Sequence, residues 1–186
     1  MFIQAFEVAP LIELKDRMAG GSYDLPLIQL FGDVSNRRYR ATPRDVRFHA
    51  KRGSTAVYGE LDKLIEGGIQ PDVSYAELAT PTVLAYLAER YAAGIGPNRF
   101  NVLGIRMVDG ALQFTGEFMP LLDHALAAGL LVHPWTLRAE RPFLLGYRAG
   151  LLSVEDEAQL LLQAGVQGFF IDQPAAGRLA VDRHYQ

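Results

Sequence analysis

The stretch from Gly129 to Arg138, which reads GLLVHPWTLR, constrains the fold of this chain more than any other. Gly129 stands where a left-handed residue would end the preceding helix. Three apolar residues follow, as in a strand buried on both faces, and lead directly into a polar and aromatic segment. Parallel α/β proteins gather their chemistry at the carboxyl ends of strands. The segment from His133 to Arg138 is therefore a predicted binding site.

The same order of helix, glycine, strand and polar residue recurs downstream. Gly165 precedes a predicted last strand over 167–171, whose apolar residues are Phe169, Phe170 and Ile171, and Asp172 and Pro174 follow it. Two such units in succession predict a β/α barrel or an open parallel sheet. Further strands are predicted over residues 2–6, which we expect to be buried, 25–31 and 92–97. Five βα units cannot form an ordinary eight-stranded closed barrel on their own.

Local signals predict several helix ends and one turn. Thr80-Pro81 is typical of a helix start with proline at its first position. Ser153, with Asp156 three residues later, approximates a capping box. Asp109-Gly110 between apolar runs predicts a small hairpin or an irregular excursion within residues 102–114. Residues 32–80 are the least regular region and are too long for an ordinary α/β connection, although 55–65 could add a short helix.

Composition limits the class of protein. With 186 residues, 49% of them apolar and 21% charged, the chain suits one soluble domain or a little more. A net charge of −3 argues against an overall nucleic-acid or membrane-surface role. The absence of cysteine excludes disulfides and thiolate metal sites. We expect no membrane span and see no signal-peptide pattern, and the chain begins like a strand already under way.

Five short peptides together resemble the glycerophosphodiester phosphodiesterase family, particularly its bacterial periplasmic type. They occur in the family's order across nearly the whole chain: residues 3–7 (IQAFE), 26–30 (PLIQL), 94–97 (GIGP), 132–138 (VHPWTLR) and 165–172 (GVQGFFID). The resemblance implies an α/β fold, a partial TIM-type (β/α) barrel made of about the last five βα units. It also implies one incomplete domain over residues 1–186.

The resemblance further implies the reaction centre that such an enzyme needs. The family uses Ca²⁺ or Mg²⁺ and two histidines to cleave a glycerophosphodiester into sn-glycerol 3-phosphate and an alcohol. In the family the His-Arg-Gly, Glu-x-Asp and His-Asp motifs, and the metal-binding glutamate with a lysine that follows them, lie before the part of the barrel matched here, and we expect them to be absent from this chain. The chain's histidines match none of these motifs: His49, His124, His133 and His184. We expect neither a catalytic residue nor a bound metal ion in this chain alone.

Three residues are predicted to contact substrate. Gln4 is an amide in a strand otherwise suited to burial, either bonded to a neighbouring strand or orienting the phosphate or a metal-bound water. Trp135, the only tryptophan, either packs on the glycerol carbons or plugs the top of the barrel, and we favour the first. Arg138 could pair with phosphate through its planar fork, although a surface arginine is the commoner outcome.

Other polar residues have simpler explanations. We expect His133 to be hydrogen-bonded in the core rather than to shuttle protons. Glu7 is expected to cap a helix or to be solvated, and Asp172 to cap a helix or brace a loop, since one carboxylate is not a metal site. Gly94, with Gly96, does not complete a dinucleotide motif, and we interpret the pair as allowing backbone to approach a ligand.

A basic segment lies within residues 37–52. It contains seven cations against only Asp45: Arg37, Arg38, Arg40, Arg44, Arg47, Lys51 and Arg52. The segment either steers anionic phosphodiesters towards the site or forms a solvated loop. Its aromatic residues, Tyr39 and Phe48, are too few to support a single-stranded nucleic-acid platform.

Three hypotheses follow. In the first, the chain is the C-terminal barrel segment of a glycerophosphodiester phosphodiesterase, inactive alone, whose partners are the glycerophosphodiester and a missing N-terminal half. In the second, it is a non-catalytic half-barrel that binds a phosphorylated ligand or self-associates through open sheet edges. The third, an independent site built from His133, Glu7 and Asp172, is the weakest. The family branch is periplasmic or secreted, but the sequence leaves the compartment open.

Overall fold

The structure, a computed structural model, describes residues 1–34, 43–147 and 150–186. They divide into two compact units. The first comprises residues 1–96 and 123–131, and the second comprises residues 97–122 and 132–186. Among the described residues, no helix has both the length and the apolar character needed to cross a membrane.

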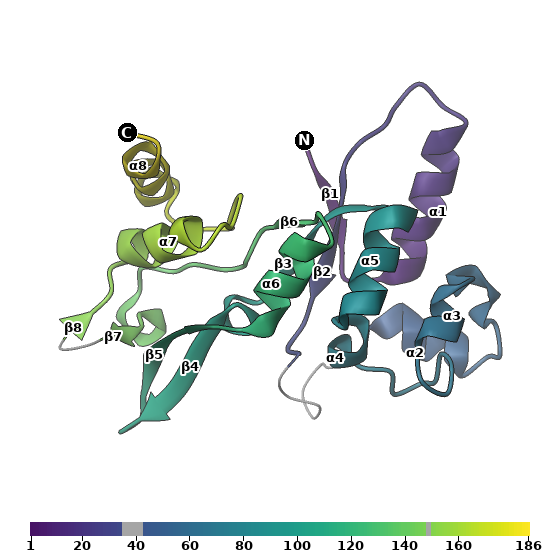
Figure 1. The fold of residues 1–186 in the computed structure, drawn as a ribbon, viewed down its shortest axis with the longest axis horizontal. Helices are drawn as coiled ribbons and strands as arrows, with labels where there is room; N and C mark the ends of the chain where they lie inside the picture. Colours follow the sequence, from purple (N-terminus) through teal and green to yellow (C-terminus); the bar gives the residue numbers. More distant parts are fainter. Residues whose placement is uncertain (35–42, 148–149) are drawn as a thin grey trace. The chain divides into compact units, whose positions relative to one another are not determined.

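A four-stranded sheet runs in the order β1-β2-β3-β6 (Figure 1). Its strands are β1 (Ile3–Ala5), β2 (Leu27–Phe31), β3 (Ala92–Pro97) and β6 (Leu131–Val132). β1 and β2 are parallel, and all five residues of β2 are buried, as its apolar run predicts. The expected α/β class with a parallel sheet and helices is confirmed.

The prediction that residues 2–6 form a buried strand is wrong. β1 is an outer strand of the sheet in the described part of the chain, so it has a hydrogen-bonded neighbour on one side only. Gln4 is exposed, and Phe2 and Phe6 are 47% and 36% exposed. An apolar run shows that a strand is suited to burial, but the position of the strand in the sheet decides whether it is buried.

Gly94 allows β3 and β6 to approach closely. A Cβ atom at this position would lie 2.5 Å from the carbonyl oxygen of Leu131 and 2.9 Å from Cδ1 of Ile28. No side chain fits at such distances from a neighbouring backbone. Gly94 therefore allows the close approach of the neighbouring strand β6, whereas the sequence suggested the approach of a ligand.

Helices flank the strands of the first unit. They are α1 (Val8–Ala19) and α5 (Pro81–Arg90), while α6 (Pro120–Ala127) leads towards β6. The predicted start of α5 is confirmed, because the Thr80 side chain accepts a hydrogen bond from the Val83 N–H at 3.4 Å. Gly129, at φ 74°, follows α6 in the left-handed conformation expected of it.

Short helices occupy the region that the sequence marks as irregular. They are α2 (Arg44–Ala50), the 3-10 helix η1 (Thr55–Tyr58), α3 (Leu61–Leu64) and α4 (Tyr75–Leu78). Where the sequence suggests one short helix over 55–65, the structure has two shorter ones. Arg37, Arg38, Tyr39 and Arg40 lie outside the described residues.

The second unit contains the predicted hairpin. β4 (Leu103–Val108) and β5 (Ala111–Phe118) are antiparallel and are joined by Asp109 and Gly110, at φ 50° and 78°. Positive φ at both positions is what a type I′ turn requires. Two short strands, β7 (Gly146–Tyr147) and β8 (Gly150–Leu151), extend this sheet.

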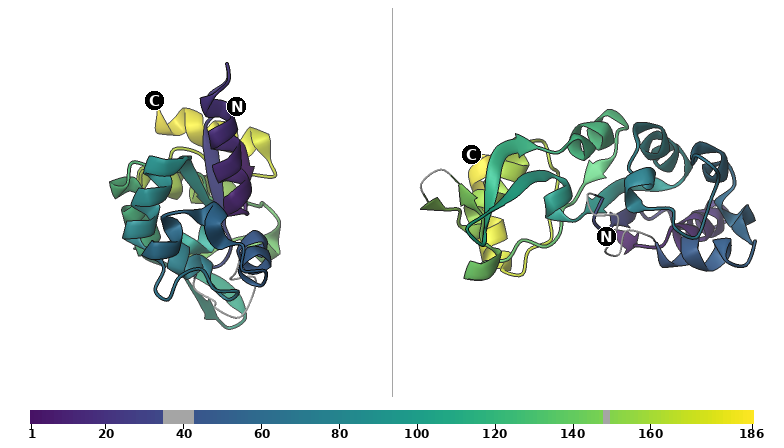
Figure 2. Two further views of the ribbon diagram at one scale, coloured as in Figure 1. Left: turned by 90° about the vertical axis from the view of Figure 1, so that its right-hand side faces the viewer. Right: turned by 90° about the horizontal axis from the view of Figure 1, so that it is seen from below.

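Two helices complete the second unit. α7 (Val154–Gln163) and α8 (Pro174–His184) lie against each other (Figures 1 and 2). The capping box at the start of α7 is confirmed, with Ser153 Oγ accepting from the Asp156 N–H at 3.1 Å. Two 3-10 helices, η2 (Arg99–Asn101) and η3 (Arg141–Phe143), connect the larger elements.

Candidate functional site

The polar segment after β6 is held by backbone pairing on one side. Trp135 bridges Asn98 in parallel: its N–H donates to the Pro97 carbonyl at 3.0 Å, and its own carbonyl accepts from the Arg99 N–H at 2.8 Å. The Asn98 side chain in turn accepts from the Phe100 N–H at 3.0 Å. These bonds fix the backbone that carries the tryptophan.

On the other side the segment contacts residues 167–171, which were predicted to form the last strand. That prediction is wrong for a regular strand, because only an isolated parallel bridge joins Leu137 and Ile171. The Phe170 N–H donates to Pro134, and the Leu137 N–H donates to Phe170. The Gln167 side chain accepts from the Val132 N–H at 2.8 Å, so an amide side chain takes the place of one ladder bond.

His133 and Trp135 are both half-buried in this segment. The imidazole packs against Gly168, where an added Cβ would come within 2.9 Å of His133 Cδ2. Burial lowers the pKa of His133 below its usual value. A half-buried indole offers a flat apolar face that can pack against the carbon atoms of a ligand.

Arg138 is engaged by three neighbours. Its Nη2 donates to Glu140 Oε1 at 2.8 Å, its Nε lies 3.1 Å from Asp172 Oδ2, and its guanidinium carbon lies 4.1 Å from the centre of the Phe143 ring. The hydrogen bond from Arg138 lowers the pKa of Glu140, and the same bond raises the pKa of Arg138. An anionic ligand would have to compete with two carboxylates for this cation.

The two carboxylates that the sequence singled out have different environments. Asp172 braces the loop through Arg138, which confirms one of the two roles expected of it. Glu7 occupies the N-cap position of α1 and makes no side-chain capping hydrogen bond. The structure thus brings Arg138 and Asp172 together within the second unit.

Gln4 lies in the first unit, opposite Ile28 on the neighbouring strand. The buried amide of this unit is instead Gln29, on β2. Its Nε2 donates to the carbonyls of Phe6 at 3.0 Å and Leu30 at 3.1 Å, and its Oε1 accepts from the Tyr91 hydroxyl at 2.6 Å. The single polar residue in the run over 25–31 was the sequence signal for this network.

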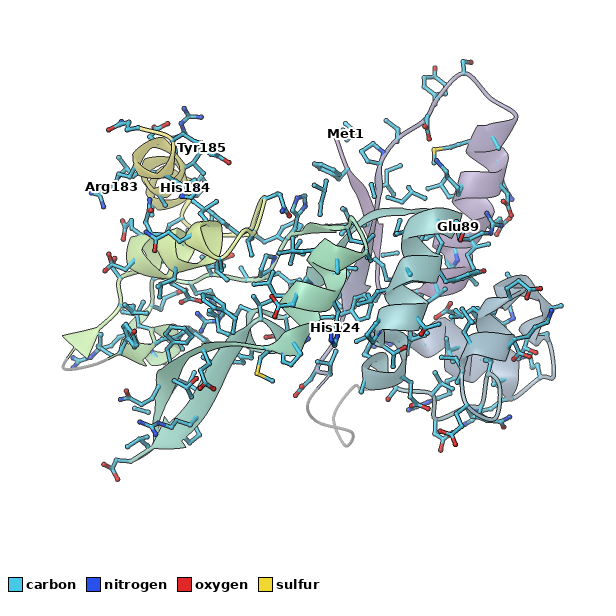
Figure 3. The ribbon with its side chains drawn as sticks, viewed as in Figure 1. Met1, Glu89, His124, Arg183, His184 and Tyr185 are labelled. Atoms are coloured by element: carbon cyan, nitrogen blue, oxygen red, sulfur yellow. The ribbon has the colours of Figure 1, made fainter. Side chains whose placement is uncertain are left out.

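The histidines lie on separate elements. His49 is on α2, His124 on α6 and His184 at the end of α8, the last two labelled in Figure 3. Across residues 1–34, 43–147 and 150–186, no three histidine or acidic side chains lie close enough together to hold a metal ion. The described carboxylates therefore do not form the cluster of oxygen ligands that Ca²⁺ or Mg²⁺ usually takes from acidic side chains.

Sequence reasoning missed the partners of Arg138. Glu140, two residues away, carried a detectable signal, because neighbouring opposite charges commonly pair. Phe143 carried no such signal, since its contact with Arg138 depends on how η3 is placed in the fold. It also missed Asp45, whose Oδ2 accepts from the Ala9 N–H at 2.7 Å and from the Tyr58 hydroxyl at 3.2 Å.

Comparison with known proteins addresses the family. No curated protein matches the chain. The model of the Glycerophosphoryl diester phosphodiesterase family matches residues 1–176, a range that includes all five peptides carrying the resemblance, the whole first unit and most of the second. The chain belongs to the glycerophosphoryl diester phosphodiesterase family.

Proposed function

We propose that this chain forms the substrate-binding wall of a glycerophosphodiester phosphodiesterase, equivalent to about the last five βα units of a TIM-type barrel of the periplasmic type. The observation that carries the proposal is the family match over residues 1–176, combined with the segment His133–Arg138 after β6. The substrate is a glycerophosphodiester. Hydrolysis adds water across the phosphorus–oxygen bond to the alcohol and yields glycerol 3-phosphate and the free alcohol.

Catalysis in this proposal requires residues that another polypeptide supplies. The family's His-Arg-Gly and His-Asp motifs have no counterpart in the sequence, and its one Glu-x-Asp, Glu60-Leu61-Asp62, lies at the start of α3 rather than at the end of a strand. The chain's own contribution is binding within the second unit, where Trp135 packs on the glycerol carbons. Arg138 pairs with the phosphate by exchanging one of its carboxylate partners, Glu140 or Asp172.

Activity and binding are tested separately. The purified chain is incubated with glycerophosphocholine and Ca²⁺ or Mg²⁺, with and without chelator, and released glycerol 3-phosphate is measured. We expect no metal-dependent release. Robust turnover that a chelator abolishes would contradict this proposal and would direct attention to Glu7, His133 and Asp172.

Binding has a built-in probe, because Trp135 is the only tryptophan. Titration with glycerophosphocholine should change its fluorescence to saturation, whereas choline alone should not. The Arg138→Ala variant should weaken this binding, while Glu140→Gln, which removes a competing charge, should strengthen it. If the fluorescence of the parent chain did not change, the proposal that this chain binds the substrate would be contradicted.

A second role, self-association, is supported by the edge of the sheet. The outer strand β1 is flanked by Phe2 and Phe6, both substantially exposed. Outer strands with apolar neighbours invite pairing with another chain. Sedimentation velocity tests this role: a Phe2→Lys/Phe6→Lys variant should be monomeric under conditions in which the parent chain associates.

A further inference from the structure

One side of α2 and of the turn after it carries a concentrated set of exposed cations. We define the α2 basic face as Arg44, Arg47, Phe48, Lys51 and Arg52, all of which are exposed. These positions are separated by three, four, seven and eight residues from the first, which places them on one side of a helix. The turn continues the helical path, because the Lys51 N–H donates to the Arg47 carbonyl at 3.2 Å.

The opposite side of α2 is attached to the first unit. Val46 is completely buried, and Asp45 accepts hydrogen bonds from the Ala9 N–H and the Tyr58 hydroxyl. The His49 ring meets the Tyr58 ring edge-on at 5.8 Å, and its Nδ1 lies 3.0 Å from Ser54 Oγ. α2 is therefore docked by one side, and the basic face is presented on a fixed support.

The cations of this face are available for an anionic partner. None of the four takes part in an ion pair with a carboxylate of the described residues. Phe48 is 49% exposed, and the guanidinium carbon of Arg52 lies 3.8 Å from its ring centre. The face therefore combines positive charge with an apolar ring, although the whole chain has a net charge of −3.

We propose that the α2 basic face binds peripherally to the surface of an anionic phospholipid bilayer. Each lysine or arginine near such a surface strengthens binding by about five-fold, and an exposed aromatic ring enters the boundary between headgroups and acyl chains. A nucleic acid is the less suitable partner, because successive bases need a row of rings and this face presents one phenylalanine. The proposal does not depend on the proposed enzyme function.

The test is co-sedimentation of the full chain with vesicles. Vesicles of phosphatidylcholine with phosphatidylglycerol should bind the protein, those of phosphatidylcholine alone should not, and added salt should release it. The double variant Arg47→Glu/Lys51→Glu should lower the partition coefficient by about 30-fold or more, from two lost contributions of about five-fold and the added repulsion. Circular dichroism checks that it folds, as expected for exposed positions.

The matched control is Arg106→Glu/Arg183→Glu, which makes the same change in net charge at two exposed positions of the second unit. It should alter partitioning by less than about two-fold, because neither position belongs to the α2 basic face. Phe48→Ala should weaken binding by about five-fold and leave the salt dependence in place. Equal losses in the two double variants would overturn the proposal.

Two further outcomes would also overturn it. In the first, soluble glycerophosphoglycerol displaces the protein from vesicles at an equal phosphate concentration, which would identify a site for single phosphates rather than for a surface. In the second, a single-stranded DNA oligonucleotide binds in a manner sensitive to Arg47→Glu/Lys51→Glu while anionic vesicles do not bind. Binding to neutral vesicles as strong as to anionic ones would count equally against it.

Discussion

Each of the two units of this protein contains a buried polar pair, and the two pairs differ in kind. The first uses neutral groups: Gln29 is completely buried and Tyr91 is 4% exposed, joined by a 2.6 Å hydrogen bond. The second uses opposite charges: Arg99 and Glu157 are 3% and 0% exposed, with hydrogen bonds of 2.6 and 2.5 Å from Nη1 to the carboxylate oxygens. The protein thus offers two kinds of buried polar pair within one chain.

The two pairs should differ in how much stability the fold loses when one member of the pair is removed. When a neutral buried group loses its partner, the folded state loses only the free energy of an unmade hydrogen bond. When a charged buried group loses its partner, the folded state contains an unpaired buried ion, and the loss of stability is larger. Burial raises the pKa of Glu157, and the guanidinium of Arg99 opposes that shift, so the pair depends on both members being present.

The largest effect is expected at the ion pair. Glu157→Leu leaves the Arg99 guanidinium buried without its carboxylate and should lower the free energy of unfolding by about 3–5 kcal/mol. Urea denaturation followed by circular dichroism measures the loss, and hydrogen exchange of α7 peptides locates it. Arg99→Met/Glu157→Leu is the control, and it should recover most of the loss because no charge remains buried. A double variant as unstable as the single one would break the distinction between the units.

A smaller effect is expected at the neutral network. Gln29→Leu leaves the Tyr91 hydroxyl without its acceptor and removes the amide donor to the Phe6 and Leu30 carbonyls, and should lower the free energy of unfolding by about 1–3 kcal/mol. The same denaturation experiment measures it. Tyr91→Phe should cost less, and the two changes together should cost less than their sum, because they remove one shared bond. Strict additivity would mean that the 2.6 Å contact contributes little.

Features determined by neighbours in sequence could be predicted. Ser153 with Asp156, Thr80 with Pro81, and Asp109 with Gly110 each act within a few residues, so a short segment contains the whole cause. The strand predicted over 25–31 followed from its apolar run in the same way, and the structure has it as β2 over Leu27–Phe31. The family resemblance rested on peptides of this kind, and the family match supports it.

Features determined by distant residues could not be predicted. Arg99 and Glu157 are 58 positions apart, and only the fold brings them together. The outer position of β1, which exposes Gln4 and Phe2, depends on strand order rather than on composition. The net charge of −3 is a sum over the whole chain. It could not predict that the cations of α2 are exposed on one side of that helix.

The smallest expected effect concerns pH and belongs to the second unit. Burial lowers the pKa of His133 in the folded chain, whereas in the unfolded chain it has its usual value of about 6.5. As the pH falls below about 6.5, His133 takes up a proton in the unfolded chain before it does so in the folded chain. The contribution of His133 to the free energy of unfolding is therefore fully present above the unfolded pKa and is lost as the pH falls towards the lower pKa of the folded chain. Between pH 7 and pH 5 the parent chain should therefore lose more stability than His133→Gln.

The neutral network supplies the control for this pH effect. Burial raises the pKa of Tyr91 well above its usual value, so its hydroxyl keeps its proton throughout the range from pH 5 to pH 7. Tyr91→Phe should therefore shift the unfolding free energy by the same amount at both pH values, whereas His133→Gln should shift it unequally. If His133→Gln left the pH dependence unchanged or made it steeper, the half-buried imidazole beside Gly168 would not be the titrating group, and the contrast between the units would rest on the ion pair alone.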